Sequence, residues 1–551
     1  MGLGILDDHH LEHVPGTSLF NDDPNAAALS AYEGFDLGKL KHAKGKNAHI
    51  VLVPQPSDDP NDPLNWPKWK KHMIMLTQSV YGTTICGALG PLVSADLVNI
   101  AIELDRSVQA LARALGSALV LALALATVVW SVMSVKIGKR PVFLMSTLLM
   151  FAGTMISSYS RESSLDVLSG SRILQGVGQA VLEFLVGASI ADIYFTHERG
   201  IPVALWNLAL LDGINITPPI SGPVIENRGW RFSFKMFSIS CGVLFLLQVF
   251  CMPETTYHRK PLKSENINPQ KVSDSSSNEK KQDIETISNE EPSTPPVPPQ
   301  KTYWEELRIY NGIYPTSASV WSLLMRPFIA CCTPVCLWAS LLYGVAITWL
   351  VLIATSVSQI FSAPPYNFSP ENVGLTYMSP FIFATIAAAL CGPLTDYVAK
   401  TMSKANLGIF EPEFRLILVA FYAVFGSMGF FGWGISANDQ DPWIGPVIFF
   451  GLISFGTTIG CSAAIGYVVD AHRQSADSAL GGVIAFSFAI TFFINDWLAD
   501  RGILNVFGIV GGITLFTSLL TIPMYIYGKR ARSWIHRTVR MDEDETTVVA
   551  H

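Results

Sequence analysis

Long apolar runs that contain almost no charged residues limit what this chain can fold into more than any other feature. Six of them precede residue 255 and six follow residue 327, and each approaches or exceeds the roughly 20 residues that a helix needs to cross a membrane. Charged residues make up only 15% of the 551 residues, against about 25% in soluble domains. A soluble enzyme, a coiled coil and a wholly disordered chain are therefore excluded, and we predict an all-α membrane protein with twelve transmembrane helices. The runs are 73–95, 108–132, 141–158, 166–191, 202–224, 233–252, 328–356, 373–396, 415–434, 443–467, 478–498 and 503–527.

The short loops between these runs differ in their content of lysine and arginine, which accumulate on the cytosolic side of membranes. Cations precede the first run, separate the second from the third, and follow the eighth, tenth and twelfth. We therefore expect both termini and the long central loop to be cytosolic. The chain then divides into a polar tail (1–70), a six-helix bundle (71–253), a largely disordered linker (254–326), a second six-helix bundle (327–529) and a C-terminal tail (530–551).

Four short motifs accompany the apolar runs, at residues 59–66, 192–200, 412–415 and 495–497. They resemble a fungal twelve-span branch of the major facilitator superfamily, which contains drug:proton antiporters and organic-cation and polyamine transporters. The resemblance implies two pseudo-symmetric six-helix bundles that alternately open a substrate path to either side of the membrane.

Three signatures of that superfamily are present in part or in full. The loop after the second run matches at Lys136, Gly138, Lys139 and Arg140, although Val135 stands where the superfamily has an aspartate that latches the bundles. The second bundle keeps a partial copy, Gly392 and Asp396. The fourth run has an intact RxxQGxG signature, and the fifth keeps Gly213, Pro218 and Gly222 of the antiporter signature, with Thr217 and Ser221 replacing glycines. These matches favour export by antiport.

Acidic residues end the fourth and tenth runs, where Asp192 is followed by Arg199 and Asp470 by Arg473. Charges at the ends of membrane helices are usually paired. We expect ion pairs that gate the cytosolic side.

Ionisable residues inside the runs are rare, because each costs about 2.5–3.5 kcal/mol on insertion scales. In the fourth run, four polar side chains fall within an arc of about 80°, and they are Arg172, Gln175, Gln179 and Glu183. In the fifth run, Asp212 and Asn215 share a face in the same way. Such faces point to a water-filled cavity or to a partner helix, never to lipid.

Carboxylates are the only protonatable candidates at depth, since all eleven histidines lie outside the runs. Removal from water favours the neutral form of a carboxylate, which can bring it into the range where proton gradients work. We hypothesise that Glu183 and Asp212 couple to protons or bind a cationic group, and that Arg172 modulates them. The alternative is that these residues satisfy one another between packed helices.

The sequence lacks the phosphate-binding loop of ATP-driven pumps and the common hydrolase motifs, so an ion gradient is the remaining energy source. We predict a proton-coupled antiporter that exports a secondary metabolite, toxin or drug, with uptake of polyamines or other organic cations as the alternative. A non-transporting sensor and a passive channel fit less well. We expect a monomer in the plasma membrane that needs no cofactor or metal, binds no nucleic acid and carries a glycosylation sequon at Asn367.

Overall fold

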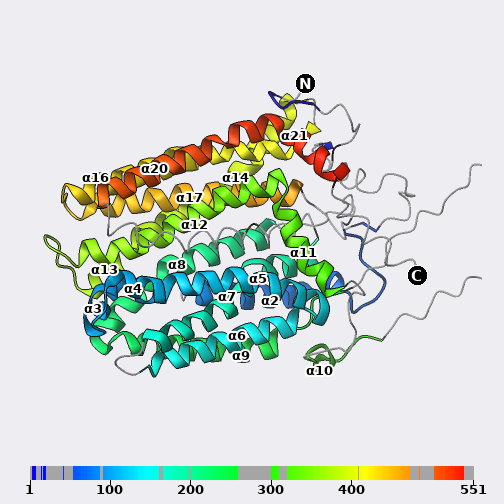
Figure 1. Ribbon diagram of the computed structural model, residues 1–551. Coiled ribbons are helices and arrows are strands. Elements are labelled where there is room, and N and C mark those ends of the chain that lie inside the picture. Colours follow the sequence, from blue (N-terminus) through cyan, green and yellow to red (C-terminus); the bar gives the residue numbers. More distant parts are fainter. Residues whose placement is uncertain are drawn as a thin grey trace, which may run out of the picture.

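The computed structural model describes residues 3–7, 14, 17–19, 41–42, 52, 54–86, 91–160, 165–195, 198, 200–257, 299–308, 319–406, 409–471, 483 and 502–538. These residues are almost entirely helical, and the long helices lie side by side in one bundle (Figure 1). A two-stranded antiparallel sheet of β1 (Ser18–Leu19) and β2 (Ile409–Phe410) is the exception.

The first half is built from helices that follow the short turn η3 (Pro63–Asn65). Its elements are α2 (Lys68–Cys86), η4 (Pro91–Asp96), α3 (Leu97–Glu103), α4 (Val108–Ala112), the π-helical turn η5 (Arg113–Ser117), α5 (Ala118–Ile137), α6 (Lys139–Ser158), α7 (Leu165–Ile193), α8 (Gly200–Arg228) and α9 (Trp230–Cys251). Side chains of α2, α5, α6, α7 and α9 form one continuous hydrophobic core.

The second half follows the short helix α10 (Tyr303–Glu306). Its elements are α11 (Val320–Cys331), α12 (Pro334–Phe361), α13 (Pro370–Thr376), α14 (Met378–Ala405), η8 (Pro412–Leu418), α15 (Val419–Phe421), the π-helical turn η9 (Tyr422–Gly426), α16 (Ser427–Asn438), α17 (Ile444–Ala471), α20 (Ile503–Leu519) and α21 (Thr521–Thr538). Two hydrophobic clusters stabilise it, one toward each end of α12.

Ten of the described helical segments are long and apolar enough to cross a membrane. The 29-residue helix α8 coincides with an eleventh predicted run. The run 478–498 lies outside the described residues except for Val483, and most of the linker also lies outside them. The all-α twelve-span fold is confirmed. The start of the seventh span differs from the prediction, because helix α11 ends at Cys331 and a new helix, α12, begins at Pro334. There Thr333 accepts a hydrogen bond from the backbone N–H of Cys336 (3.4 Å), and proline suits the first helical position.

The two halves meet closely at one end of the bundle, where the last turns of α8 contact α13. A Cβ atom added at Gly222 would lie 2.7 Å from the carbonyl oxygen of Pro370, and one at Gly374 would collide with the carbonyl of Pro218. Only glycine therefore permits this approach of the two backbones. The side chain of Glu226 also accepts a hydrogen bond from the N–H of Glu371 at 3.0 Å. This end, with α3 and α13, lies opposite α11 and the last turns of α21 (Figure 1).

Candidate functional site

The polar stripe of α7 begins inside the first half. The guanidinium of Arg172 is fully buried, donates to Oε1 of Gln175 (2.9 Å) and lies over the ring of Phe234 on α9, 5.0 Å from its centroid. Gln175 in turn donates to the hydroxyl of Ser157 on α6 (2.9 Å). The structure thus places Arg172 and Gln175 among neighbouring helices of their own half.

One to two turns further along α7, the same stripe reaches the other half. Gln179 is fully buried, and its side-chain amide has no hydrogen-bond partner among the described residues. Glu183 keeps partial exposure and lies within electrostatic range of Cys86 on α2 and Tyr343 on α12. Tyr343 itself packs against the cores of both halves. Glu183 therefore lies near the boundary between the two halves.

The carboxylate of Asp212 joins the two halves directly. Its Oδ2 accepts a hydrogen bond from the hydroxyl of Thr385 on α14 at 3.0 Å, while its buried Oδ1 has no partner in the described part of the chain. Asn215 donates to the carbonyl of Leu211 within α8 (3.2 Å). Thr385 was not predicted, because a lone threonine in an apolar run gives no signal in sequence.

Thr385 has one hydroxyl proton and two acceptors within reach, since the carbonyl of Phe381 also lies 2.8 Å from its oxygen. An ionised Asp212 requires that proton. A protonated Asp212 can instead donate to the Thr385 oxygen and leave the threonine proton for Phe381. The hydrogen bond between α8 and α14 can therefore form whether Asp212 is ionised or protonated, and the donor and acceptor exchange roles between the two states.

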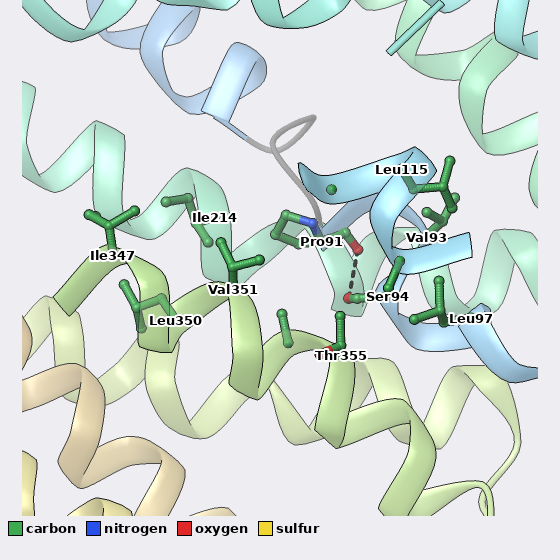
Figure 2. Close-up of a pocket in the computed structure, with 13 residues that line it drawn as sticks. Pro91, Val93, Ser94, Leu97, Leu115, Ile214, Ile347, Leu350, Val351 and Thr355 are labelled. Atoms are coloured by element: carbon green, nitrogen blue, oxygen red, sulfur yellow. Dashed lines mark hydrogen bonds between the residues drawn. The ribbon is translucent and has the colours of Figure 1, made fainter. Parts of the chain in front are cut away.

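An apolar cavity lies between the halves, on another face of α8, and Figure 2 shows the side chains that line it. The space between the atoms there is about 690 Å³, a volume that includes open solvent. The hydroxyls of Ser94 and Thr355 are the polar side-chain groups in its lining, and Ser94 donates to the carbonyl of Pro91 (2.9 Å). Ile214 lines the cavity from a position about 200° around α8 from Asp212. The apolar cavity and that carboxylate thus lie on different faces of one helix.

The loop between α5 and α6 forms a compact corner with the ends of α7 and α9, beyond Lys136 in the last turn of α5. Lys139 forms a 2.6 Å ion pair with Asp192. The carboxylate of Glu254 accepts hydrogen bonds from the backbone N–H groups of Lys139 and Arg140, both at 3.0 Å. Gly138 has φ +94°, and a Cβ there would lie 2.6 Å from Glu254. Glu254 was not predicted as part of this corner.

The matching residues of the second half are arranged differently. Asp470 pairs with Arg415 (2.9 Å), and Asp396 and Gly392 lie exposed on α14. The side chains of Arg199 and Arg473 lie outside the described residues, so the ion pairs expected for them stay predictions.

The remaining candidate sites are the glycosylation sequon and any cluster of metal ligands. Asn367 is exposed in the loop between α12 and α13 with φ +47°, and its glycosylation stays a prediction. Within the described ranges, no three His, Cys, Asp or Glu side chains gather closely enough to hold a metal ion.

Comparison with known proteins gives a consistent result. Residues 75–481 match the sequence profile of the Major Facilitator Superfamily. An MFS-type transporter of Schizosaccharomyces pombe is 26% identical over 96% of this chain and 94% of its own length. The MFS antiporter QDR3 of Candida albicans is 24% identical over 88% of this chain and 81% of its own. The crystal structure of a D-xylose-proton symporter shares the fold, with a TM-score of 0.58 at 13% identity, and the match covers 84% of this chain and 99% of the symporter.

Proposed function

The chain belongs to the Major Facilitator Superfamily, whose members are transporters rather than enzymes, and from that premise we propose a proton-coupled antiporter. Its cargo is a small, partly apolar organic molecule that leaves the cytosol by alternating access between the two halves. We place the protein in the plasma membrane as a monomer with cytosolic termini. With that orientation the tight contact of α8 with α13 lies on the outer side.

The hydrogen bond between Asp212 and Thr385 carries this proposal. Asp212 is an ionisable group on α8 of the first half, bonded at 3.0 Å to α14 of the second. Alternating access changes the contacts between the halves, so a proton on Asp212 is placed where it can alter the balance between the two states. Its buried Oδ1, which has no hydrogen-bond partner among the described residues, can accept a proton.

Glu183 is the second proposed coupling residue. Its side chain is partly exposed, and Tyr343 of the second half, within electrostatic range of it, has a ring on which a cationic or flat group can stack. Gln179, one turn away on the same face, supplies an amide for hydrogen bonding. Arg172 and Gln175 then act as a buried support for this face, and Asn215 lies one turn from Asp212.

Uptake of polyamines or other organic cations is the second candidate function. Two carboxylates near the interface suit a ligand with separated amines, and they would then serve as cation ligands rather than proton carriers. The direction of substrate flux distinguishes the two candidates.

The test measures retention of a fluorescent cationic drug and entry of labelled spermidine, in cells with and without the protein, at two external pH values. Export by antiport predicts lower drug retention that depends on the proton gradient and is lost in Glu183→Gln and Asp212→Asn. Thr385→Val should impair transport while Thr385→Ser retains it, because only serine keeps the hydroxyl. Faster spermidine entry would instead establish uptake, and normal proton-linked flux in both carboxylate variants would refute the coupling roles.

A further inference from the structure

The first residues of the chain contact its second half, 390 or more positions away in the sequence. We call the described residues 3–7, 14 and 17–19 the N-terminal arm. Strand β1 pairs with β2 so that Ser18 lies opposite Phe410 and Leu19 opposite Ile409. At the other end of the arm, the N–H of Leu6 donates to the carbonyl of Ile526 on α21 (3.0 Å). Main-chain pairing therefore holds the arm at two separate places.

An apolar contact accompanies these hydrogen bonds. Ile5 is only 6% exposed and packs in a small cluster with Phe410 and Phe414. The neighbouring Leu6 is 36% exposed. One side chain of this pair thus enters the cluster, and the other remains at the surface.

Polar groups of the arm also contact a charged network on the second half. Asp7 pairs with Lys529 (3.0 Å), which also pairs with Glu411 (2.8 Å). The hydroxyl of Thr17 donates to the same Glu411 carboxylate at 2.8 Å. Beneath these groups the guanidinium of Arg532 binds Glu411 and Glu413, and all three side chains are at most 2% exposed. Buried charges of this kind are stable only while their hydrogen bonds are complete, and the arm supplies part of them.

Residues that follow the arm contact the first half instead. The hydroxyl of Tyr257, beyond the end of α9, donates to Asp59 (3.0 Å) and accepts from Ser57 (3.1 Å). Trp66 belongs to the hydrophobic core of the first half. The region before the first span therefore reaches both halves of the transporter, whereas its sequence predicted only a polar tail.

We propose that the surface formed by β2, η8 and α21 is a binding site for the N-terminal arm, and that the arm is an intramolecular ligand that completes the second half. The site recognises an extended peptide that offers a strand edge, one buried aliphatic side chain and one acidic side chain. Occupancy of the site determines the stability of the second half. This inference concerns the assembly of the fold and does not depend on the direction or substrate of transport.

A cysteine pair tests the docking in the full-length chain. Directly opposed residues of antiparallel strands have Cα atoms about 4.5–5.5 Å apart, within the range of a disulfide. Ser18→Cys with Phe410→Cys should cross-link under mild oxidation, as detected by mass spectrometry of the linked peptides. Ser18→Cys with Val135→Cys, which lies exposed on α5 of the other half, should not. Equal cross-linking of the two pairs, or none in the first, would overturn the proposal.

A second experiment tests whether occupancy stabilises the protein. Ile5→Asp places a charge in the apolar cluster and should lower the Tm of the purified full-length protein by about 2–4 °C, whereas Leu6→Asp, at the exposed neighbour, should leave it unchanged. A synthetic peptide of residues 1–20 should bind the Ile5→Asp protein saturably, restore its Tm and bind the unmodified protein at least tenfold more weakly. If the two variants have equal Tm values, or the peptide binds neither protein, the arm is not a ligand of this site.

Discussion

The first half has a corner where the loop between α5 and α6 meets the end of α9, and the second half has one where the segment between α14 and η8 meets α21. Each corner contains a cation near the start of a helical segment that is paired with an aspartate at the end of a long helix, Lys139 with Asp192 and Arg415 with Asp470. Beyond these pairs the corners differ. In the first corner, single side chains form hydrogen bonds with the backbone groups at helix ends. In the second corner, a network of opposite charges is buried, and the N-terminal arm covers it.

The difference lies in what each charge faces. Glu254 binds backbone N–H groups at the start of α6, and Arg140 donates to carbonyls of Val249 (2.8 Å) and Met252 at the end of α9. Both interactions complement the partial charges of helix termini. Arg532 instead faces Glu411 and Glu413, and all three side chains are at most 2% exposed, so the loss of one partner leaves a buried charge uncompensated. We therefore expect the second corner to tolerate substitution less than the first.

The largest effect should come from Arg532→Ala. The substitution removes the cation paired with buried Glu413 and leaves Glu411 with Lys529 alone, at a cost of about 3–5 kcal/mol. Thermal unfolding monitored by fluorescence and size-exclusion chromatography should show a large fall in Tm or in folded yield. Arg537→Ala, at an exposed position on the same helix, is the matched control and should behave as the unmodified protein. Equal stability of the two variants would contradict the importance of the buried network.

Glu254→Ala should have the next largest effect. It removes the acceptor for two backbone N–H groups of α6, and hydrogen bonds to a charged group contribute about 1.5–3 kcal/mol. The same thermal unfolding assay should place Glu254→Gln between Glu254→Ala and the unmodified protein, because glutamine keeps one acceptor oxygen. If Glu254→Ala proves as damaging as Arg532→Ala, the proposed contrast between the corners is wrong.

The two signature glycines should respond in opposite directions. Gly138→Ala forces an L residue to φ +94° against Glu254 and should cost about 1–3 kcal/mol. Gly392→Ala meets no atom within 4 Å of the new Cβ and should stabilise α14 by about 0.5–1 kcal/mol. Denaturation midpoints of the two variants measure both signs at once. A loss of stability in Gly392→Ala would reveal a contact that the described conformation lacks.

The smallest effects on stability should come from the ion pairs that the corners share. Each pair is partly exposed and is worth less than about 1 kcal/mol. Lys139→Asp should slow transport, and the exchange Lys139→Asp with Asp192→Lys should restore part of the rate in the flux assay. The same exchange at Arg415 and Asp470 tests whether the two corners gate alike. Failure of rescue in both halves would assign these pairs a purely structural role.

The sequence predicted the spans well because hydropathy over 20 residues is a strong signal, but it could not locate breaks within them. The break before Pro334 depends on the capping hydroxyl of Thr333 inside an apolar run. Angular spacing placed Arg172 and Glu183 on one face of α7 yet could not show what faces them at each depth. One lies among helices of its own half, and the other approaches the second half. Contacts such as that of Thr385 with Asp212 join distant segments and have no local signature.

The backbone contact between α8 and α13 has a consequence for energy conservation. An antiporter that leaks protons dissipates the gradient that drives it, and protons cross proteins readily along files of water. Where the Cβ-less glycines 222 and 374 bring main chains together, no space remains between these two segments for such a file. In the proposed orientation Asp212 lies on the inner side of this contact, so in the proposed antiport cycle the contact would help to separate that carboxylate from the outer medium.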